Sequence, residues 1–178
     1  MDKEENAIIL DYLPYGYPLE GKTNPVAQAI GEKSFILLQL VPRRGVQLQP
    51  KEKVYIGEGK RDKIYYILGR LHKEKLTENA KIQIEDFVSK VVGERESEFI
   101  EFFNKAGAIN TRIHQLELLP GFGKKHTEEL LKARDEKPFE SFEEMKKRVS
   151  NIPDPKKAVE KRITEELITV QRNNLFTK

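Results

Sequence analysis

The C-terminal fold is decided by one short stretch, Leu118-Leu119-Pro120-Gly121-Phe122-Gly123-Lys124-Lys125-His126. Apolar residues lie before and after it at the spacing of a helical face, so we expect two helices joined by a very tight turn. Gly121 and Gly123 carry no Cβ and can adopt positive φ. The backbone can therefore turn sharply at these glycines and let another molecule approach closely.

The positions after the turn suit an anion. The first turn of a helix leaves N–H groups without intrahelical partners and carries the positive end of the helix dipole. Lys124 and Lys125 add two full positive charges at that point. Helix starts of this kind commonly bind phosphate oxygens. The sequence therefore predicts a phosphate contact at the turn.

Residues 113–134 resemble the helix-hairpin-helix family, whose members bind nucleic acids without sequence specificity. In that family the hairpin glycines and the following helix start bind backbone phosphates. The resemblance implies phosphate-binding residues at five positions: Gly121, Phe122, Gly123, Lys124 and Lys125. The alternative is a plain pair of helices with a glycine turn inside a packed core, and the two lysines argue against it.

A second unit of the same kind follows in the tail. Ser141-Phe142-Glu143-Glu144 is typical of a capping box that opens a helix. Asn151-Ile152-Pro153-Asp154-Pro155 stands where a second hairpin turn would lie, but it has no glycine, and Asp154 is negative where phosphate would bind. We expect an all-α tandem helix-hairpin-helix domain over residues 111–178, with a binding first hairpin and a degenerate, structural second one.

Residues 1–75 are expected to form a small β-domain. Their β-branched, aromatic and leucine-rich runs are bounded by Gly, Pro and charged turns: Ala7–Leu10, Ser34–Val41, Lys53–Gly57 and Lys63–Leu71. Closely spaced short strands favour an OB-like barrel, since closure removes sheet edges, although an SH3-like barrel fits the same pattern. Helical spacing begins at residue 76, so we expect connecting helices over 76–110 and an α+β fold class.

A second nucleic-acid surface is expected on the barrel, where tyrosines and basic residues share the predicted loops and strand edges: Tyr15, Tyr17, Arg43, Arg44, Lys60, Arg61 and Lys63. Aromatic rings beside basic loops can stack bases and follow a single-stranded backbone. Packing of the tyrosines in the core or at its rim is the alternative interpretation.

Residues 16–23 fit the phosphate-binding loop pattern G-x-x-x-x-G-K-[ST]. Two prolines oppose that interpretation, because Pro18 removes an N–H from the loop and Pro25 interrupts the helix that should follow. A β-barrel also lacks the strand–helix–strand alternation that such a loop needs. Nucleotide (NTP) binding through residues 16–23 is therefore only an alternative function.

Composition limits the classes of protein. Of 178 residues, 34% are charged and 38% hydrophobic, with no apolar run long enough to cross a bilayer, so we expect a cytoplasmic protein without a membrane partner. The chain has no cysteine and only three scattered histidines, so we expect neither metal nor cofactor. A net charge of +3 favours local contacts over polycation binding.

Four segments together resemble a whole-chain family: residues 11–16 (Asp-Tyr-Leu-Pro-Tyr-Gly), 27–33 (Ala-Gln-Ala-Ile-Gly-Glu-Lys), 54–63 (Val-Tyr-Ile-Gly-Glu-Gly-Lys-Arg-Asp-Lys) and 114–121 (His-Gln-Leu-Glu-Leu-Leu-Pro-Gly). They are similar to the archaeal family labelled domain of unknown function 655. That family is described as RNA- or nucleotide-binding, with an OB-like N-terminal part, a helix-hairpin-helix C-terminal part and genes that lie among translation and transcription genes. The resemblance implies RNA rather than DNA as partner, in the setting of the ribosome or the transcription machinery.

No catalytic group stands out. Helix-hairpin-helix glycosylases need an aspartate a little beyond the hairpin, where this chain has Glu136-Lys137-Pro138-Phe139-Glu140. We therefore expect a non-enzymatic, translation-related RNA-binding protein. An adaptor that associates with the ribosome or with RNA polymerase through protein contacts is the other alternative.

Overall fold

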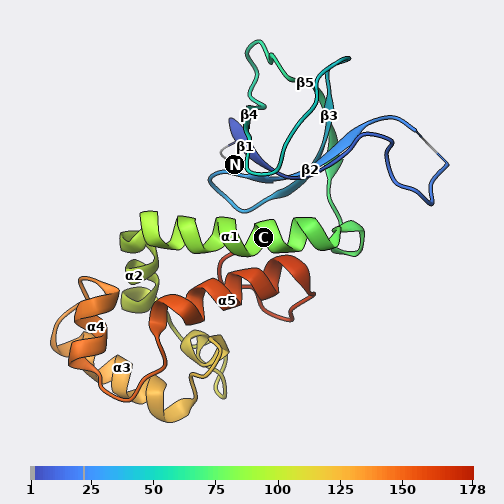
Figure 1. Cartoon of the computed structure of the whole chain (residues 1–178). Helices are drawn as coiled ribbons and strands as arrows, with labels where there is room; N and C mark the ends of the chain where they lie inside the picture. The colour runs from blue at the N-terminus through green and yellow to red at the C-terminus, as the bar shows by residue number, and fades with distance from the viewer. Residues whose placement is uncertain (1–2, 22) are drawn as a thin grey trace. The chain divides into compact units, whose positions relative to one another are not determined.

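The structure, a computed structural model, describes residues 3–21 and 23–178. It has an α+β fold in which five strands precede five α-helices in the described part of the chain (Figure 1). These residues form two compact units: a sheet unit, from 3–86 together with 166–178, and a helical unit, from 87–165. The C-terminal tail thus belongs with the strands, whereas the sequence pattern groups residues 111–178 together.

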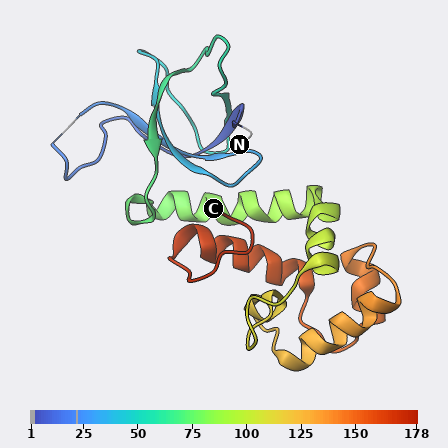
Figure 2. The same ribbon diagram turned by 180° about the vertical axis from the view of Figure 1, so that it is seen from behind.

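The sheet unit contains one antiparallel sheet with strand order β4-β1-β2-β3-β5, which curls into a half-barrel (Figures 1 and 2). Its strands are β1 (Asn6–Leu13), β2 (Val26–Gly31), β3 (Leu37–Pro42), β4 (Lys53–Tyr55) and β5 (Ile64–Arg70). β4 and β5 are the two outer strands, and no ladder joins them within the described residues. The predicted β-rich N-terminal domain is therefore confirmed as a curled, open sheet.

β2 is the central strand, and the sequence pattern predicts no strand there. Its residues, Val26-Ala27-Gln28-Ala29-Ile30-Gly31, are rich in alanine and poor in the β-branched and aromatic types that strands favour. All of them are buried. Both faces of β2 are covered, so small side chains there allow close packing where local preference would not choose a strand.

The two faces of the sheet differ. One carries the core of the sheet unit, built from apolar residues of all five strands and of the connections between them: Ala7, Ile9, Ala27, Ala29, Leu40, Leu48, Val54, Ile56 and Ile64. On the opposite face, Gln28 of β2 pairs with Gln39 of β3. Gln28 donates to the carbonyl of Lys75 at 2.7 Å and accepts from the N–H of Thr77 at 3.1 Å. This buried amide therefore holds the segment that leads out of β5.

The helical segments follow the predicted periodicity. They are η1 (Lys73–Lys75), α1 (Glu78–Glu94), α2 (Glu96–Lys105), η2 (Gln115–Leu118), α3 (Lys124–Glu136), α4 (Phe142–Arg148) and α5 (Pro155–Ile168). The two helices expected after residue 76 are confirmed as α1 and α2. The first helix of the hairpin is shorter than expected, because only the four-residue 3-10 helix η2 forms before the turn.

Phe103 lies at the centre of the helical unit. It is fully buried, and its ring centroid lies 6.4 Å from that of Phe122 and 6.4 Å from that of Phe142. Arg134 of α3 donates to the carbonyls of Phe103 and Ala106 at 3.0 and 2.7 Å. Aromatic packing and these charge-assisted bonds therefore fix α3 against the end of α2.

Glu166, near the end of α5, binds the C-terminal tail. It is 1% exposed, and its carboxylate accepts from the backbone N–H groups of Leu175, Phe176 and Thr177 at 2.8, 3.0 and 3.0 Å. Lys73 donates to the carbonyl of Glu166 at 2.6 Å. The tail is thus hydrogen-bonded back onto the end of α5.

Replacement of Glu166 by alanine should release the tail. Loss of the ionised acceptor leaves several backbone donors unsatisfied, so we expect the free energy of unfolding to fall by about 1.5–3 kcal/mol. Hydrogen exchange at residues 175–177 should become faster. The control Glu136→Ala, which removes an exposed carboxylate, should change neither the free energy of unfolding nor this exchange rate. Unchanged exchange at 175–177 in Glu166→Ala would show that other contacts dock the tail.

Candidate nucleic-acid interface

The turn between η2 and α3 spans residues 119–123. Gly121 has a φ of 83°, and the N–H of Phe122 donates to the carbonyl of Leu119 at 3.0 Å. A Cβ built on Gly121 would lie 3.1 Å from Cγ of Pro153, in the second turn. Gly121 is therefore needed both for the backbone conformation and for the packing of one turn against the other.

Gly123 has a different role from Gly121. Its φ is −103°, in the extended region, so the expectation that both glycines serve the turn through positive φ is wrong for this residue. A Cβ on Gly123 would meet nothing within 4 Å. Nothing in the described structure requires glycine there. The missing side chain instead leaves open space over the start of α3.

Phe122 does not offer the phosphate contact that the resemblance implies. Its side chain is 4% exposed, and its ring centroid lies 5.9 Å from that of His126. Its N–H is already bonded within the turn. Phe122 therefore anchors the turn in the core, next to Phe103. The other four predicted residues, Gly121, Gly123, Lys124 and Lys125, flank it in the chain.

The start of α3 differs from the other helix starts of the hairpin region. His114 Nδ1 accepts from the N–H of Leu116 at 3.1 Å in η2, and Ser141 Oγ accepts from that of Glu144 at 3.0 Å in α4. No side chain among the described residues accepts a first-turn N–H of α3 in this way, and His126 Nδ1 accepts only the N–H of Gly123, the residue before the helix, at 3.3 Å. The first-turn N–H groups of α3 are therefore available to an outside acceptor.

The degenerate second turn fills the corresponding position with its own carboxylate. Asp154 Oδ1 accepts from the N–H of Lys157 at 3.2 Å, and Lys146 Nζ lies 3.7 Å from Asp154 Oδ2. Asp154 thus caps the helix α5, which begins at Pro155. Asn151 adopts a φ of 67° in a turn without glycine. The carboxylate of Asp154 thus lies at the start of α5, whereas the corresponding position at the start of α3 is open.

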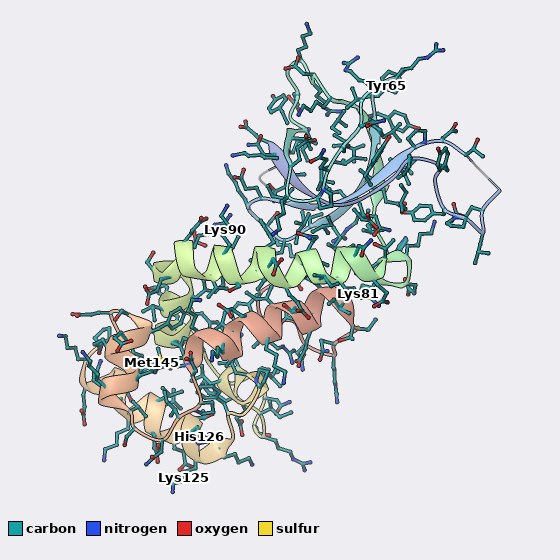
Figure 3. All side chains as sticks on the ribbon, viewed as in Figure 1. Tyr65, Lys81, Lys90, Lys125, His126 and Met145 are labelled. Carbon is teal, nitrogen blue, oxygen red and sulfur yellow. The ribbon has the colours of Figure 1, made fainter. Side chains whose placement is uncertain are left out.

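Positive charge surrounds that open position. Lys124 and Lys125 are exposed, no ion pair engages either within the described chain, and the first turn of α3 has no acidic residue. Figure 3 shows Lys125 extending away from the ribbon. Because a helix start carries partial positive charge, the two lysines and the backbone act in the same direction on an approaching anion.

Arg112 joins this group, although the sequence pattern did not single it out. It lies with Lys124 on the wall of a hollow of about 230 Å³, which Glu128 also lines. Asn110 Oδ1 accepts from the N–H groups of Arg112 and Ile113 at 2.8 and 2.9 Å, which shapes the loop that carries Arg112. Only the fold of this loop brings Arg112 to α3, so periodicity carried no signal of it.

Three basic residues of the predicted barrel surface have structural roles. The N–H of Arg43 donates to the carbonyl of Lys63 at 2.8 Å, and its Nε donates to the carbonyl of Arg61 at 2.7 Å. Arg61 Nε donates to the carbonyl of Gly57 at 2.8 Å, and Lys63 pairs with Glu52. These bonds shape the loop between β4 and β5.

Arg44 and Lys60 are exposed, like Arg43 and Lys63, but they differ from the three bonded residues in their contacts. Neither forms an ion pair or side-chain hydrogen bond with another described residue. Both lie in connections next to the bonded Arg43–Lys63 segment. The structure thus brings all five predicted basic residues to one end of β3 and β5, with Arg44 and Lys60 directed to solvent.

The two predicted tyrosines lie on the connection between β1 and β2, which projects from the sheet in both views (Figures 1 and 2). Tyr15 is 78% exposed. Tyr17 is half-buried: its hydroxyl donates to Gln39 Oε1 at 2.8 Å, and Lys75 Nζ lies 4.8 Å from its ring centroid. Burial raises the pKa of Tyr17. Tyr17 thus packs at the rim of the core, which was the alternative to a binding role for the tyrosines. Tyr15, in contrast, is exposed.

Residues 16–23 do not form a nucleotide-binding loop in the described structure. Residues 16–21 and 23 connect β1 to its antiparallel neighbour β2, and no helix follows them. A phosphate-binding loop needs the N-terminus of a helix directly after it. Lys22 lies outside the described residues. The NTP-binding alternative therefore lacks its structural basis.

Across residues 3–21 and 23–178, no group of three or more His, Cys, Asp or Glu side chains could hold a metal ion. Within the same ranges, no helix is both long enough and apolar enough to cross a membrane.

Comparisons with known proteins place the whole chain. The model of the family described as "Protein of unknown function (DUF655)" matches residues 3–178. Uncharacterized protein MJ0038 of Methanocaldococcus jannaschii is 40% identical over 173 residues, which cover 97% of this chain and 78% of that protein. The crystal structure of Af1531 from Archaeoglobus fulgidus matches with a TM-score of 0.83 and 39% identity, covering 98% of this chain and 100% of that one.

Acidification should weaken the hairpin at His114. Burial and, after it, the nearby Arg134 lower the pKa of His114 below its ordinary value of 6.5, against an opposing effect of Glu117. In its neutral form, Nδ1 of His114 accepts the N–H of Leu116. The unfolded chain then binds more protons than the folded one, so this contribution to stability is present above pH 6.5 and is lost as the pH falls below it.

The melting temperature measured between pH 7.5 and 5 checks this sign. Wild-type protein should lose more stability over that interval than His114→Asn, whose amide can cap η2 without titrating. Equal losses in the two proteins would mean that His114 does not carry the pH dependence.

Proposed function

We propose that this chain, which belongs to the DUF655 family of proteins of unknown function, is a non-enzymatic nucleic-acid-binding protein. It grips backbone phosphates at the start of α3, and RNA is its preferred partner. The observation that carries the proposal is the uncapped start of α3 at Gly123, directly followed by Lys124 and Lys125. Phosphate oxygens can accept the first-turn N–H groups while the lysines supply opposite charge.

The contrast between the two turns supports this role. Asp154 supplies α5 with an internal carboxylate acceptor, and Gly123 supplies α3 with none. A helix start with glycine as its cap is less stable than one capped by aspartate by about a few tenths of a kcal/mol, unless an anion binds there. The site on α3 is therefore suited to a ligand, whereas the corresponding site on α5 is self-contained.

The sheet unit provides the second contact of this proposal. The order β4-β1-β2-β3-β5, with an open seam between β4 and β5, supports an OB-type barrel, a partly open five-stranded architecture. Barrels of that type bind oligonucleotides through the connections after their first and fourth strands. Here Tyr15 lies on the first of these connections and Lys60 on the second.

The preference for RNA rests on the resemblance to the archaeal family and its setting among translation genes, which also favours a cytoplasmic role near the ribosome or the transcription machinery. Contacts to phosphates alone would not distinguish sequences, so we expect weak sequence specificity. They would also make the affinity strongly dependent on salt, because bound phosphates release counterions. These two properties distinguish the proposal from an adaptor that docks only to protein.

Replacement of Lys124 by alanine tests the phosphate site. We expect weaker binding to every RNA sequence, and a slope of log affinity against log salt that is smaller by about 1, because one phosphate contact is lost. Lys132→Ala is the matched control, since Lys132 is exposed on the same helix, two turns beyond Lys124. Binding of a fluorescent RNA oligonucleotide at several salt concentrations measures both quantities.

The control variant should keep the wild-type slope. If Lys124→Ala and Lys132→Ala have the same slope, α3 does not contact phosphate through its first turn. Salt-insensitive association with a purified ribosome or RNA polymerase, without any binding to RNA, would favour the adaptor alternative instead.

A further inference from the structure

A pocket of about 280 Å³ opens on the face of β2, β3 and β5 that lies opposite the core. Its walls include Tyr17, Val41, Tyr66 and Leu68, with Lys75 at the edge. The volume is slightly below that of pockets that hold drug-sized ligands, about 300–1,000 Å³. It therefore suits a single planar ring system.

A β-bulge lies next to Tyr66, the tyrosine of β5 that lines this pocket. Val41 pairs with Tyr66 and Pro42 pairs with Ile64, so Tyr65 is the extra residue on β5. Tyr65 is 64% exposed and Tyr66 is 43% exposed, and their ring centroids lie 5.3 Å apart in an edge-to-face arrangement. In a regular strand one of two neighbouring tyrosines would face the core, and bulges redirect side chains in this way. Figure 3 shows Tyr65 where β3 and β5 lie.

The remaining walls of the pocket are held in place. Tyr17 donates to Gln39 and accepts from Gln28 Nε2 at 3.3 Å, while Gln39 Nε2 donates to the carbonyl of Arg70 at 3.1 Å. Lys75 pairs with Glu20 across the rim. Each buried amide thus has both its oxygen and its nitrogen engaged. The pocket presents rings, apolar surface and the Lys75–Glu20 ion pair at its rim, which suits stacking better than readout of hydrogen-bonding edges.

Charge near the pocket indicates what kind of ring binds. β3 leads from Val41 in the pocket wall to the exposed Arg44, and β5 follows the loop that holds Lys60. Asp62 is an acidic residue of the same loop. Exposed cations on the connections that follow β3 and precede β5 complement a planar base attached to a negatively charged backbone.

We propose that one unpaired nucleobase of a single strand binds in this pocket by stacking on Tyr66, next to the hydrogen-bonded Tyr17, with the adjoining phosphates directed toward Arg44 and Lys60. This inference deepens the proposed function and rests on it, since it assigns the single-stranded part of the ligand to the sheet unit. Stacking on Tyr66 is tolerant of base identity, because every base has a π-face.

The test uses full-length protein and a single-stranded 12-nucleotide RNA carrying one 2-aminopurine, whose fluorescence falls on stacking. Tyr66→Ala should weaken binding by about 5- to 100-fold, since one stacked base is lost, while the salt slope stays unchanged. Tyr66→Phe, which keeps the ring, should bind within about twofold of wild type. Replacement of the bases by abasic residues should weaken wild-type binding to the same extent and remove the effect of Tyr66→Ala.

Each remaining outcome has one meaning. Wild-type affinity and quenching in Tyr66→Ala would overturn the stacking site, and the proposed function would stand if Lys124→Ala still changes the salt slope. Equal affinity of wild-type protein for normal and abasic RNA would overturn it independently of any variant. If wild-type protein binds neither RNA nor DNA of the same length, both the proposed function and this inference are overturned. If RNA and DNA bases stack equally well, the site stands and its preference for RNA is removed.

Discussion

The requirement that polar groups at a helix start find acceptors organises the hairpin region. η2, α4 and α5 meet it with His114, Ser141 and Asp154, so these helices are complete without a partner. α3 begins at Gly123, which has no side chain to offer. Phe122 fixes this start against the aromatic core, so the exposed donors belong to a rigid element and not to a mobile loop. A preformed anion site costs little to order when it binds.

The sheet unit shows the same combination of fixed support and open surface. The buried amides of Gln28 and Gln39 hold the tyrosine-bearing connection and the segment after β5 on one face of the sheet. Their hydrogen bonds satisfy groups that would otherwise be costly to bury. The exposed rings of Tyr65 and Tyr66 lie on the strand next to this face. In the proposed function, each unit supplies one surface for a different part of a nucleic acid, the phosphates or the bases.

Much of the helical unit could be predicted from local signals. Ser141 and Asp154 are strong caps, and apolar residues at helical spacing place the buried faces of α1 and α5. β2 could not be predicted, because close tertiary packing explains its alanines and local strand preference does not. The conformation of Gly123 was equally hidden, because glycine is compatible with both signs of φ. The adjacent tyrosines 65 and 66 were a usable signal, because strict alternation in a half-buried strand would have hidden one of them.

The most direct measurement compares RNA affinity in wild-type protein and in Gly123→Asp, which gives α3 the acceptor that Asp154 gives α5. Nothing within 4 Å opposes a Cβ at this position, and aspartate is a better cap than glycine by a few tenths of a kcal/mol, so the variant should fold at least as stably as wild type. Its carboxylate should occupy the anion position and repel phosphate, lowering affinity by about tenfold or more. A stably folded Gly123→Asp protein that binds RNA as tightly as wild type would contradict the account.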